Sequence, residues 1–239
     1  MIGKLAFLGI AIFFVCDVTF GETKNEAIKR LKKELFNDYD KHKIPRKNGK
    51  GPVYVGLGLR ITHVDQLNEK EETVTLHGYL VTVWNDEFFR WNPVDYANLQ
   101  FLSFRDIVHH GLYDVWYPAI EFYSTGKDGR GSSNTETFFV RSTGYIYHKL
   151  SFSVTPPCNF DYAQYPNDQQ ECVLVLWVED KRLDQVELMH SSKLDPFKYW
   201  TSPKYESRNK TQAGGWLLSD YNTTLTYFGL GTRTTNATR

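Results

Sequence analysis

The hydrophobic pattern of the chain changes after residue 50, and this change constrains its fold more than any other feature. From Val53 to Leu59 every second residue is aliphatic, and the alternation returns in residues 74–83. A period of two is typical of β-strands, because successive side chains point to opposite faces of a sheet. Further strands are predicted at residues 137–141, 145–154, 172–178, 216–221 and 223–228. No second helical period occurs after residue 50, which argues against a parallel α/β sheet and favours an antiparallel all-β sandwich.

One amphipathic helix is predicted before this β-region. Thr23 is a suitable N-cap, and Ile28, Leu31 and Leu35 recur at helical spacing with basic residues between them. The helix is expected to end near residues 43–45, and the glycine- and proline-rich residues 48–52 then form a linker. The predicted architecture is therefore a single N-terminal α-helix followed by a β-sandwich.

The first 21 residues have the pattern of a secretory signal peptide. Lys4 supplies a positive charge, residues 5–15 are apolar, and residues 19–21 include small side chains for cleavage. A membrane anchor is the alternative, but spanning a bilayer takes about 20 apolar residues. The sequence therefore predicts a secreted, extracellular chain whose single domain is residues 22–239.

Export bears directly on the cysteines. Cleavage after Gly21 removes Cys16 and leaves Cys158 and Cys172 as the only thiols. Two cysteines in an exported chain suggest one disulfide, because oxidising compartments preserve such bonds. A pair of buried free thiols is the alternative.

Charge and motifs exclude several function classes. The 28 basic and 28 acidic residues balance, so neither nucleic acid nor an anionic membrane surface is an expected partner. No apolar run long enough to cross a membrane occurs after the signal. Hydrolase, zinc-peptidase and nucleotide-loop motifs are absent, and His109 and His110 lack ligand-like spacing to acids or thiols. The sequence therefore predicts no enzyme, no cofactor and no metal site.

The segment between the two cysteines carries a family resemblance. Residues 158–172 contain the turn Tyr165-Pro166-Asn167-Asp168, and this segment resembles the signature loop of the Cys-loop receptors, the pentameric ligand-gated ion channels. Further landmarks appear in family order, from the opening helix through residues 55–59 and 84–93 to Trp116-x-Pro118. The resemblance implies a ten-stranded, twisted, antiparallel β-sandwich of immunoglobulin-like type with an N-terminal helix. It also implies a ring of five subunits.

In such rings the ligand lies between neighbouring subunits, inside a cage of aromatic side chains. By the resemblance, Tyr123 matches the tyrosine of the first loop, and Tyr227 matches the tyrosine that opens the third loop. The opposite face is implied to contain four residues: Tyr79, Phe139, Tyr147 and Lys149. Because aromatic rings hold an ammonium by cation–π attraction, the implied ligand is a small cationic amine, such as a biogenic amine. Core or rim positions are the ordinary alternative for tyrosines on strands.

Two residues compete for the second-loop position. Counting from Cys172 without a gap places Glu179 there, whereas Trp177 reaches it if two residues are missing. A carboxylate pairs with a primary amine, while an indole favours a quaternary ammonium. The third loop has no adjacent cysteine pair and no second tyrosine after Tyr227, which argues against acetylcholine binding of the receptor type.

Three functions are consistent with these residues. The first is a secreted, homopentameric ligand-binding protein, closest in architecture to the soluble acetylcholine-binding proteins. The second is the extracellular domain of a channel subunit whose membrane part is missing from this sequence. The third is a secreted scaffold or adhesion protein with a degenerate pocket. Extracellular exposure also predicts glycosylation at three N-x-S/T sequons: Asn209, Asn222 and Asn236.

Overall fold

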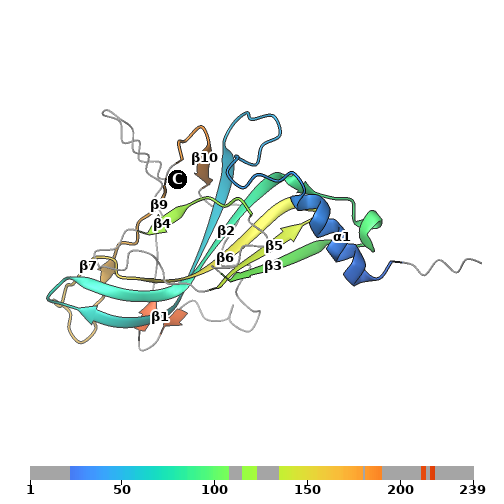
Figure 1. The fold of residues 1–239 in the computed structure, drawn as a ribbon. Coiled ribbons are helices and arrows are strands. Elements are labelled where there is room, and N and C mark those ends of the chain that lie inside the picture. Colours follow the sequence, from blue (N-terminus) through green and yellow to red (C-terminus); the bar gives the residue numbers. More distant parts are fainter. Residues whose placement is uncertain are drawn as a thin grey trace, which may run out of the picture.

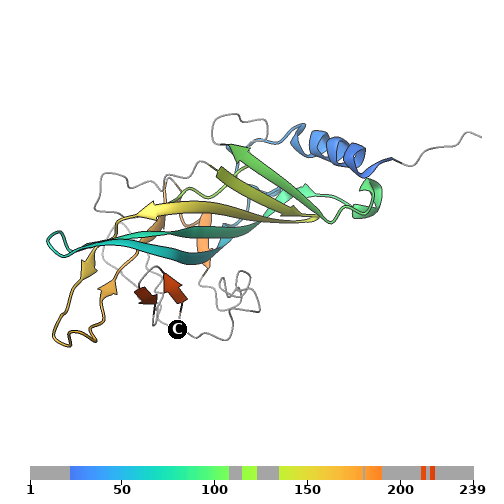
Figure 2. The same ribbon diagram turned by 90° about the horizontal axis from the view of Figure 1, so that it is seen from below.

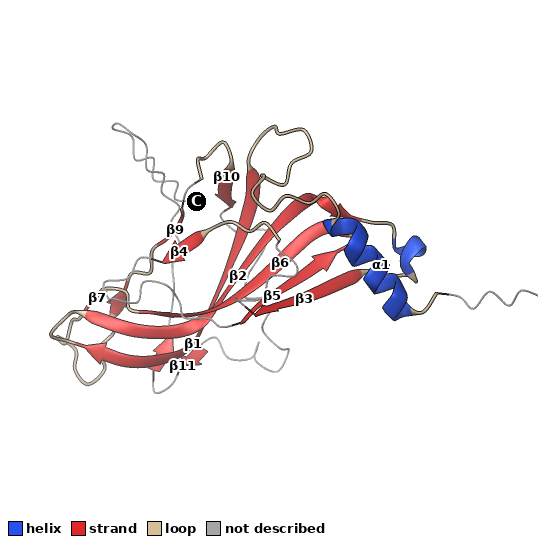
Figure 3. Ribbon diagram, viewed as in Figure 1, coloured by secondary structure: helices blue, strands red, loops and turns tan. Residues whose placement is uncertain are grey.

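A computed structural model of the chain describes residues 22–107, 115–122, 135–179, 181–189, 211–213 and 216–218. These residues form one α-helix, α1 (Lys24–Phe36), one short 3₁₀ helix, η1 (Pro93–Tyr96), and strands β1 to β12 (Figure 1). The strands are β1 (Val53–Asn68), β2 (Thr73–Arg90), β3 (Phe101–Ile107), β4 (Ile120–Phe122), β5 (Thr135–Arg141), β6 (Thr143–Val154), β7 (Cys158–Asn159), β8 (Glu171–Cys172), β9 (Leu176–Val178), β10 (Val186–Met189), β11 (Thr211–Ala213) and β12 (Trp216–Leu218). Figure 3 shows the predominance of strands over helices.

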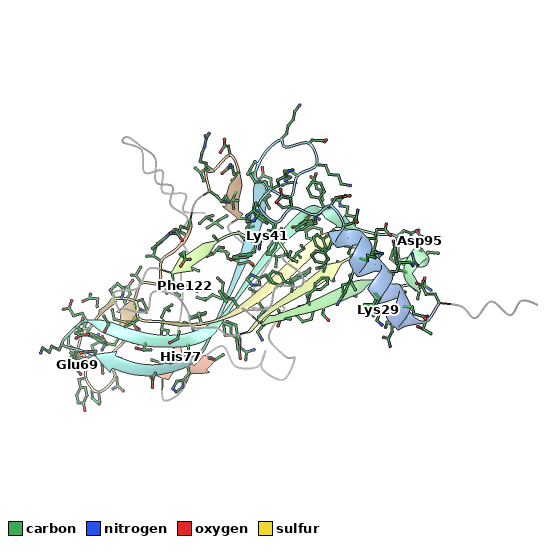
Figure 4. The ribbon with its side chains drawn as sticks, in the orientation of Figure 1. Lys29, Lys41, Glu69, His77, Asp95 and Phe122 are labelled. Carbon is green, nitrogen blue, oxygen red and sulfur yellow. A yellow bond between two sulfur atoms is a disulfide. The ribbon has the colours of Figure 1, made fainter. Side chains whose placement is uncertain are left out.

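The N-terminal helix begins where the sequence predicts. Thr23 caps α1 and forms a capping box with Glu26, in which the Thr23 N–H donates to the Glu26 carboxylate at 2.9 Å. Ala27 and Leu31 are buried in the core, one helical turn apart. The helix lies at the end of the sheet opposite the β1–β2 turn, as the labels Lys29 and Glu69 show in Figure 4.

The helix ends earlier than expected. It stops at Phe36 rather than near residues 43–45. The next residues bond to β2 instead of continuing the helix: Tyr39 Oη donates to Asp86 Oδ2 at 2.7 Å, and the Glu87 N–H donates to the Pro45 carbonyl at 3.2 Å. These contacts join residues far apart in sequence, so helical periodicity alone could not predict them.

The main sheet contains six strands in the order β10-β1-β2-β6-β5-β3, and it twists along its length (Figure 2). Its neighbours are antiparallel except for β1 and β10, which are parallel, with Val53 opposite Val186. The expected wholly antiparallel arrangement is therefore wrong at this edge. The chain passes through β9, in a separate two-stranded sheet, before it reaches β10 beside β1.

A second layer covers the inner face of this sheet. Strand β4 pairs with β9, and the Phe122 ring of β4 lies 4.8 Å from the Phe152 ring of β6. Leu176 of β9 packs against the same hydrophobic cluster. Towards α1, Trp84 is 1% exposed and makes an edge contact with Trp116 at 5.8 Å between ring centroids. Two packed layers of strands behind one helix confirm the predicted all-β class.

A buried polar cluster ties three segments together. Asp86 is 0% exposed and accepts hydrogen bonds from Tyr39 Oη and from the Phe88 N–H, at 2.7 and 2.8 Å. Tyr39 Oη in turn accepts from the Trp116 N–H at 3.0 Å. Burial raises the pKa of Asp86 to about 6, although these donors act in the opposite direction. The cluster joins the segment after α1, strand β2 and the segment before β4.

The predicted disulfide is confirmed. Cys158 and Cys172 are bonded and face each other in the β7–β8 pair. The Cys158 N–H donates to the Glu72 carbonyl at 2.8 Å, which anchors the closed loop beside the β1–β2 turn. The strand predicted at residues 172–178 is interrupted, since β8 ends at Cys172 and β9 begins at Leu176. Of the last two predicted strands, residues 216–218 form β12, and residues 223–228 lie outside the described part of the chain.

Candidate functional site

Four of the predicted ligand-binding residues lie on one face of the six-stranded sheet: Tyr79 in β2, Phe139 in β5, and Tyr147 and Lys149 in β6. In the β2–β6 register, Val81 pairs with Lys149 and Val83 pairs with Tyr147. Tyr79 lies two residues before Val81 in β2, so its side chain points to the same face as those of Lys149 and Tyr147. In the β5–β6 register, Phe139 stands opposite Tyr147. These four side chains define what we name the basic aromatic face.

This face points away from the core. The neighbours Leu80, Phe138 and Ile146 on the same three strands are buried in the hydrophobic clusters. Alternation then directs the candidate residues outward, and Tyr79 and Phe139 are 36% and 43% exposed. An outward row of aromatic rings on adjacent strands is a surface suited to a ligand or a partner chain.

Lys149 lies over the ring of Tyr79. Its Nζ is 3.8 Å from the ring centroid, within the range of a cation–π contact. Arg60 of β1 stands opposite Tyr79 in the β1–β2 register. Loss of solvent, together with the charge of Arg60, lowers the pKa of Lys149. Lys149 and Arg60 therefore place two positively charged side chains of the protein on this face.

Sequence reasoning missed a further cation, Arg141, on the same face. The Arg141 guanidinium lies 5.3 Å from the ring of Phe101 and 5.8 Å from that of Tyr147. Arg141 is two residues after Phe139 in β5, so strand alternation alone places both on one side. The period-two pattern was the signal that could have identified it.

The two competing second-loop residues, Trp177 in β9 and Glu179 directly after it, both point outward. Leu176 and Val178 pack against the core, whereas Trp177 is 37% exposed and Glu179 is also exposed. The Glu179 N–H donates to the Ala119 carbonyl at 2.8 Å, which extends the β4–β9 pairing by one bond. Trp177 and Glu179 therefore share one side of the strand. We name this pair the β9 edge.

Within one chain the β9 edge and the basic aromatic face point in opposite directions. Leu176 and Val178 pack on the core from the β4–β9 layer, while Leu80 and Phe138 pack on it from the six-stranded sheet. The outward sides of the two layers are thus separated by the packed core. A single chain does not bring these two groups of predicted residues together.

Several predicted residues lie outside the described part of the chain: Tyr123, Tyr227, Asn209, Asn222 and Asn236. Their roles stay predictions. Within the residues that the structure describes, no three His, Cys, Asp or Glu side chains are placed to hold a metal ion. Nor does that part contain a helix with the length and apolar character needed to span a bilayer.

Comparison with known proteins assigns the chain to a family. The neurotransmitter-gated ion-channel ligand binding domain matches residues 28–231. Acetylcholine receptor-like protein cup-4 of Caenorhabditis briggsae is 28% identical over 188 residues, covering 75% of this chain and 41% of that protein. Human neuronal acetylcholine receptor subunit alpha-4 is 28% identical over 214 residues, covering 84% of this chain and 30% of the subunit. Xenopus laevis acetylcholine receptor subunit epsilon is 31% identical over 159 residues, covering 66% and 30% respectively.

The chain thus spans 41% or less of the length of these three relatives. The family match nevertheless covers most of this chain, including most of the helix, the main sheet, the disulfide-closed loop and β9. The chain belongs to the family of neurotransmitter-gated ion-channel ligand-binding domains, the extracellular binding domains of the Cys-loop receptors.

Proposed function

We propose that the chain is a secreted protein that binds a small neurotransmitter-like amine between neighbouring copies in a homopentamer. One observation carries the proposal: the basic aromatic face and the β9 edge lie on opposite sides of the packed layers. Copies arranged head to tail in a closed ring place one surface against the other. A composite site at each contact would then contain residues from both subunits.

The β9 edge supplies the chemistry that attracts an amine. Trp177 offers an indole face for cation–π attraction, and Glu179 offers a carboxylate two residues away on the same side. Tyr123 and Tyr227, matched by the family resemblance, would complete this half of the cage. The composite site therefore holds an ammonium group on the β9 side of the contact. The proposed activity is binding, without a chemical reaction.

A second candidate comes from the length of the relatives. Because the chain spans 41% or less of those proteins, it also fits the extracellular domain of a channel subunit. The two candidates share the binding site, and only the channel subunit has a membrane part after the domain. A transcript that continues past Arg239 into four apolar helices would support the channel subunit and contradict the secreted protein.

Two measurements test the proposal. Native mass spectrometry of the exported protein should show a pentamer, and biogenic amines should change the intrinsic tryptophan fluorescence. In Tyr123→Ala and Tyr227→Ala, the amine response should be lost. Tyr165→Ala is the matched control, because it removes a ring that is 77% exposed in the disulfide-closed loop and should leave the response unchanged.

The outcomes separate the candidates. A strict monomer would remove the interface site altogether. A pentamer that responds to no amine in the panel would contradict ligand binding and favour the scaffold alternative. A response that survives in Tyr123→Ala and Tyr227→Ala would place the ligand elsewhere on the molecule.

A further inference from the structure

The balanced charge of the whole chain conceals a positive segment between α1 and β1. Residues 41–50, which we name the basic segment, contain no acidic side chain and five basic ones: Lys41, Lys43, Arg46, Lys47 and Lys50. Because the chain has 28 residues of each sign, the remainder has 23 basic against 28 acidic residues. Short segments rich in lysine and arginine are typical of surfaces that bind anionic polymers.

Contacts with β2 anchor the middle of the basic segment. Pro45 is fully buried, and its carbonyl accepts from the Glu87 N–H at 3.2 Å. The Glu87 Oε2 accepts from the Lys47 N–H at 2.7 Å, and its Oε1 accepts from the Arg46 guanidinium at 3.1 Å. Both oxygens of this carboxylate are therefore engaged by the backbone and by Arg46, and not by a lysine side chain of the segment.

The lysine side chains extend into solvent around this anchor. Lys43, Lys47 and Lys50 are all exposed, and the Lys43 side chain is 78% exposed although its Nζ lies 3.7 Å from Asp40. An ion pair between side chains as exposed as these contributes little to stability, so Lys43 can exchange Asp40 for another anion. The segment thus combines an anchored backbone with three accessible ammonium groups.

Two glycines shape the turn that carries Lys50. Gly49 and Gly51 have φ angles of 60° and 74°, a conformation that residues with a Cβ rarely adopt. A Cβ at either position would meet nothing within 4 Å, so the backbone angle requires glycine here and space does not. The turn projects from the fold just before β1 begins at Val53 (Figure 1).

The apolar side chains of the basic segment point inward. They are Ile44, which packs against the larger hydrophobic cluster, and the buried Pro45. Membrane-surface segments commonly add exposed apolar groups to their basic ones. Anionic lipids are also concentrated in the cytoplasmic leaflet, whereas this family's binding domain is extracellular. These two observations favour an anionic polymer in solution or on a polysaccharide chain over a lipid surface.

We propose that the basic segment binds a sulfated polysaccharide outside the cell. Sulfate groups remain ionised at neutral pH and repeat along such a polymer, so one chain can contact Lys43, Lys47 and Lys50 together. This activity goes beyond the proposed amine binding, because it uses the segment between α1 and β1 and none of the residues of the basic aromatic face or the β9 edge.

Calorimetric titration of the full exported protein with a heparin decasaccharide tests the proposal. The decasaccharide should bind, and raising the salt concentration should weaken binding because added ions screen exposed charges. A hyaluronan decasaccharide, which has carboxylates and no sulfates, should bind at least about tenfold more weakly. Vesicles that contain phosphatidylserine should not bind.

Variants locate the binding surface. The triple variant Lys43→Gln, Lys47→Gln and Lys50→Gln should bind the heparin decasaccharide at least about tenfold more weakly, since each exposed ion pair contributes a factor of roughly two to three. Replacing the same three residues with arginine keeps the charges and should retain binding. Circular dichroism should show an unchanged melting temperature for both variants, because the three positions are exposed.

The matched control removes three charges from another surface. Lys24, Lys29 and Lys33 are exposed on α1, and their combined replacement by glutamine should leave heparin binding as in wild type. An equal loss in both glutamine variants would show that binding follows net charge and would overturn the role of the basic segment. Binding to the vesicles without binding to heparin would overturn the proposal in favour of a lipid surface.

Discussion

The buried carboxylate of Asp86 should make stability fall as pH rises, which is the reverse of the usual behaviour of a carboxylate. Its pKa is raised from 3.8 to about 6, and its side chain is 0% exposed. Between these values the folded chain binds a proton that the unfolded chain has released. The stability gained from this group is therefore fully present below about pH 4 and lost as pH rises through about 6, by about 3 kcal/mol.

The variant Asp86→Asn removes this titration with little change of shape. An asparagine stays neutral, and its amide oxygen can still accept from the Phe88 N–H. The free energy of unfolding of Asp86→Asn, minus that of wild type, should therefore rise by about 2–3 kcal/mol from pH 4 to pH 7.5, measured by urea denaturation with the disulfide intact. Asp95→Asn, at an exposed position in η1, is the control and should track wild type at every pH.

Tyr39→Phe tests the cause of the effect. It removes the hydroxyl that donates to Asp86, so the pKa of Asp86 should rise further and the variant should lose more stability at pH 7.5 than at pH 4. If the curves of wild type and Asp86→Asn remain parallel from pH 4 to 7.5, the carboxylate does not change its protonation in the folded chain over that range. The reasoning from burial would then be wrong.

Three further changes have defined expectations. Cys158→Ser should lower the free energy of unfolding by about 3 kcal/mol in urea, because an open loop gains conformational freedom in the unfolded chain. Gly78→Ala should lower the melting temperature measured by circular dichroism, with a cost of about 1–3 kcal/mol, because the new Cβ would overlap the Arg60 carbonyl oxygen. Glu87→Gln should destabilise the chain more at pH 7 than at pH 3, because the backbone hydrogen bond from Lys47 lowers the pKa of Glu87 and favours its charged form.

The local sequence determined much of the fold. Period-two alternation located parts of β1 and β2, strand composition located β5 and β6, and Thr23 marked the start of α1 because capping depends on residues within one turn. The same alternation is why Tyr79 and Lys149, once matched to the family, lie on an outward face. Export and cysteine count led to the disulfide. Each of these conclusions depends on neighbours in sequence or on a residue type.

Only the tertiary structure decided which groups meet across the fold. Tyr39, three residues after the helix ends at Phe36, donates a hydrogen bond to the buried carboxylate of Asp86, although the two residues are 47 positions apart. The placement of Lys149 over Tyr79, and the opposition of the β9 edge to the basic aromatic face, likewise depend on strand register and layer packing. Such contacts join distant residues, and their energies come from shared burial, so no local pattern in the sequence encodes them.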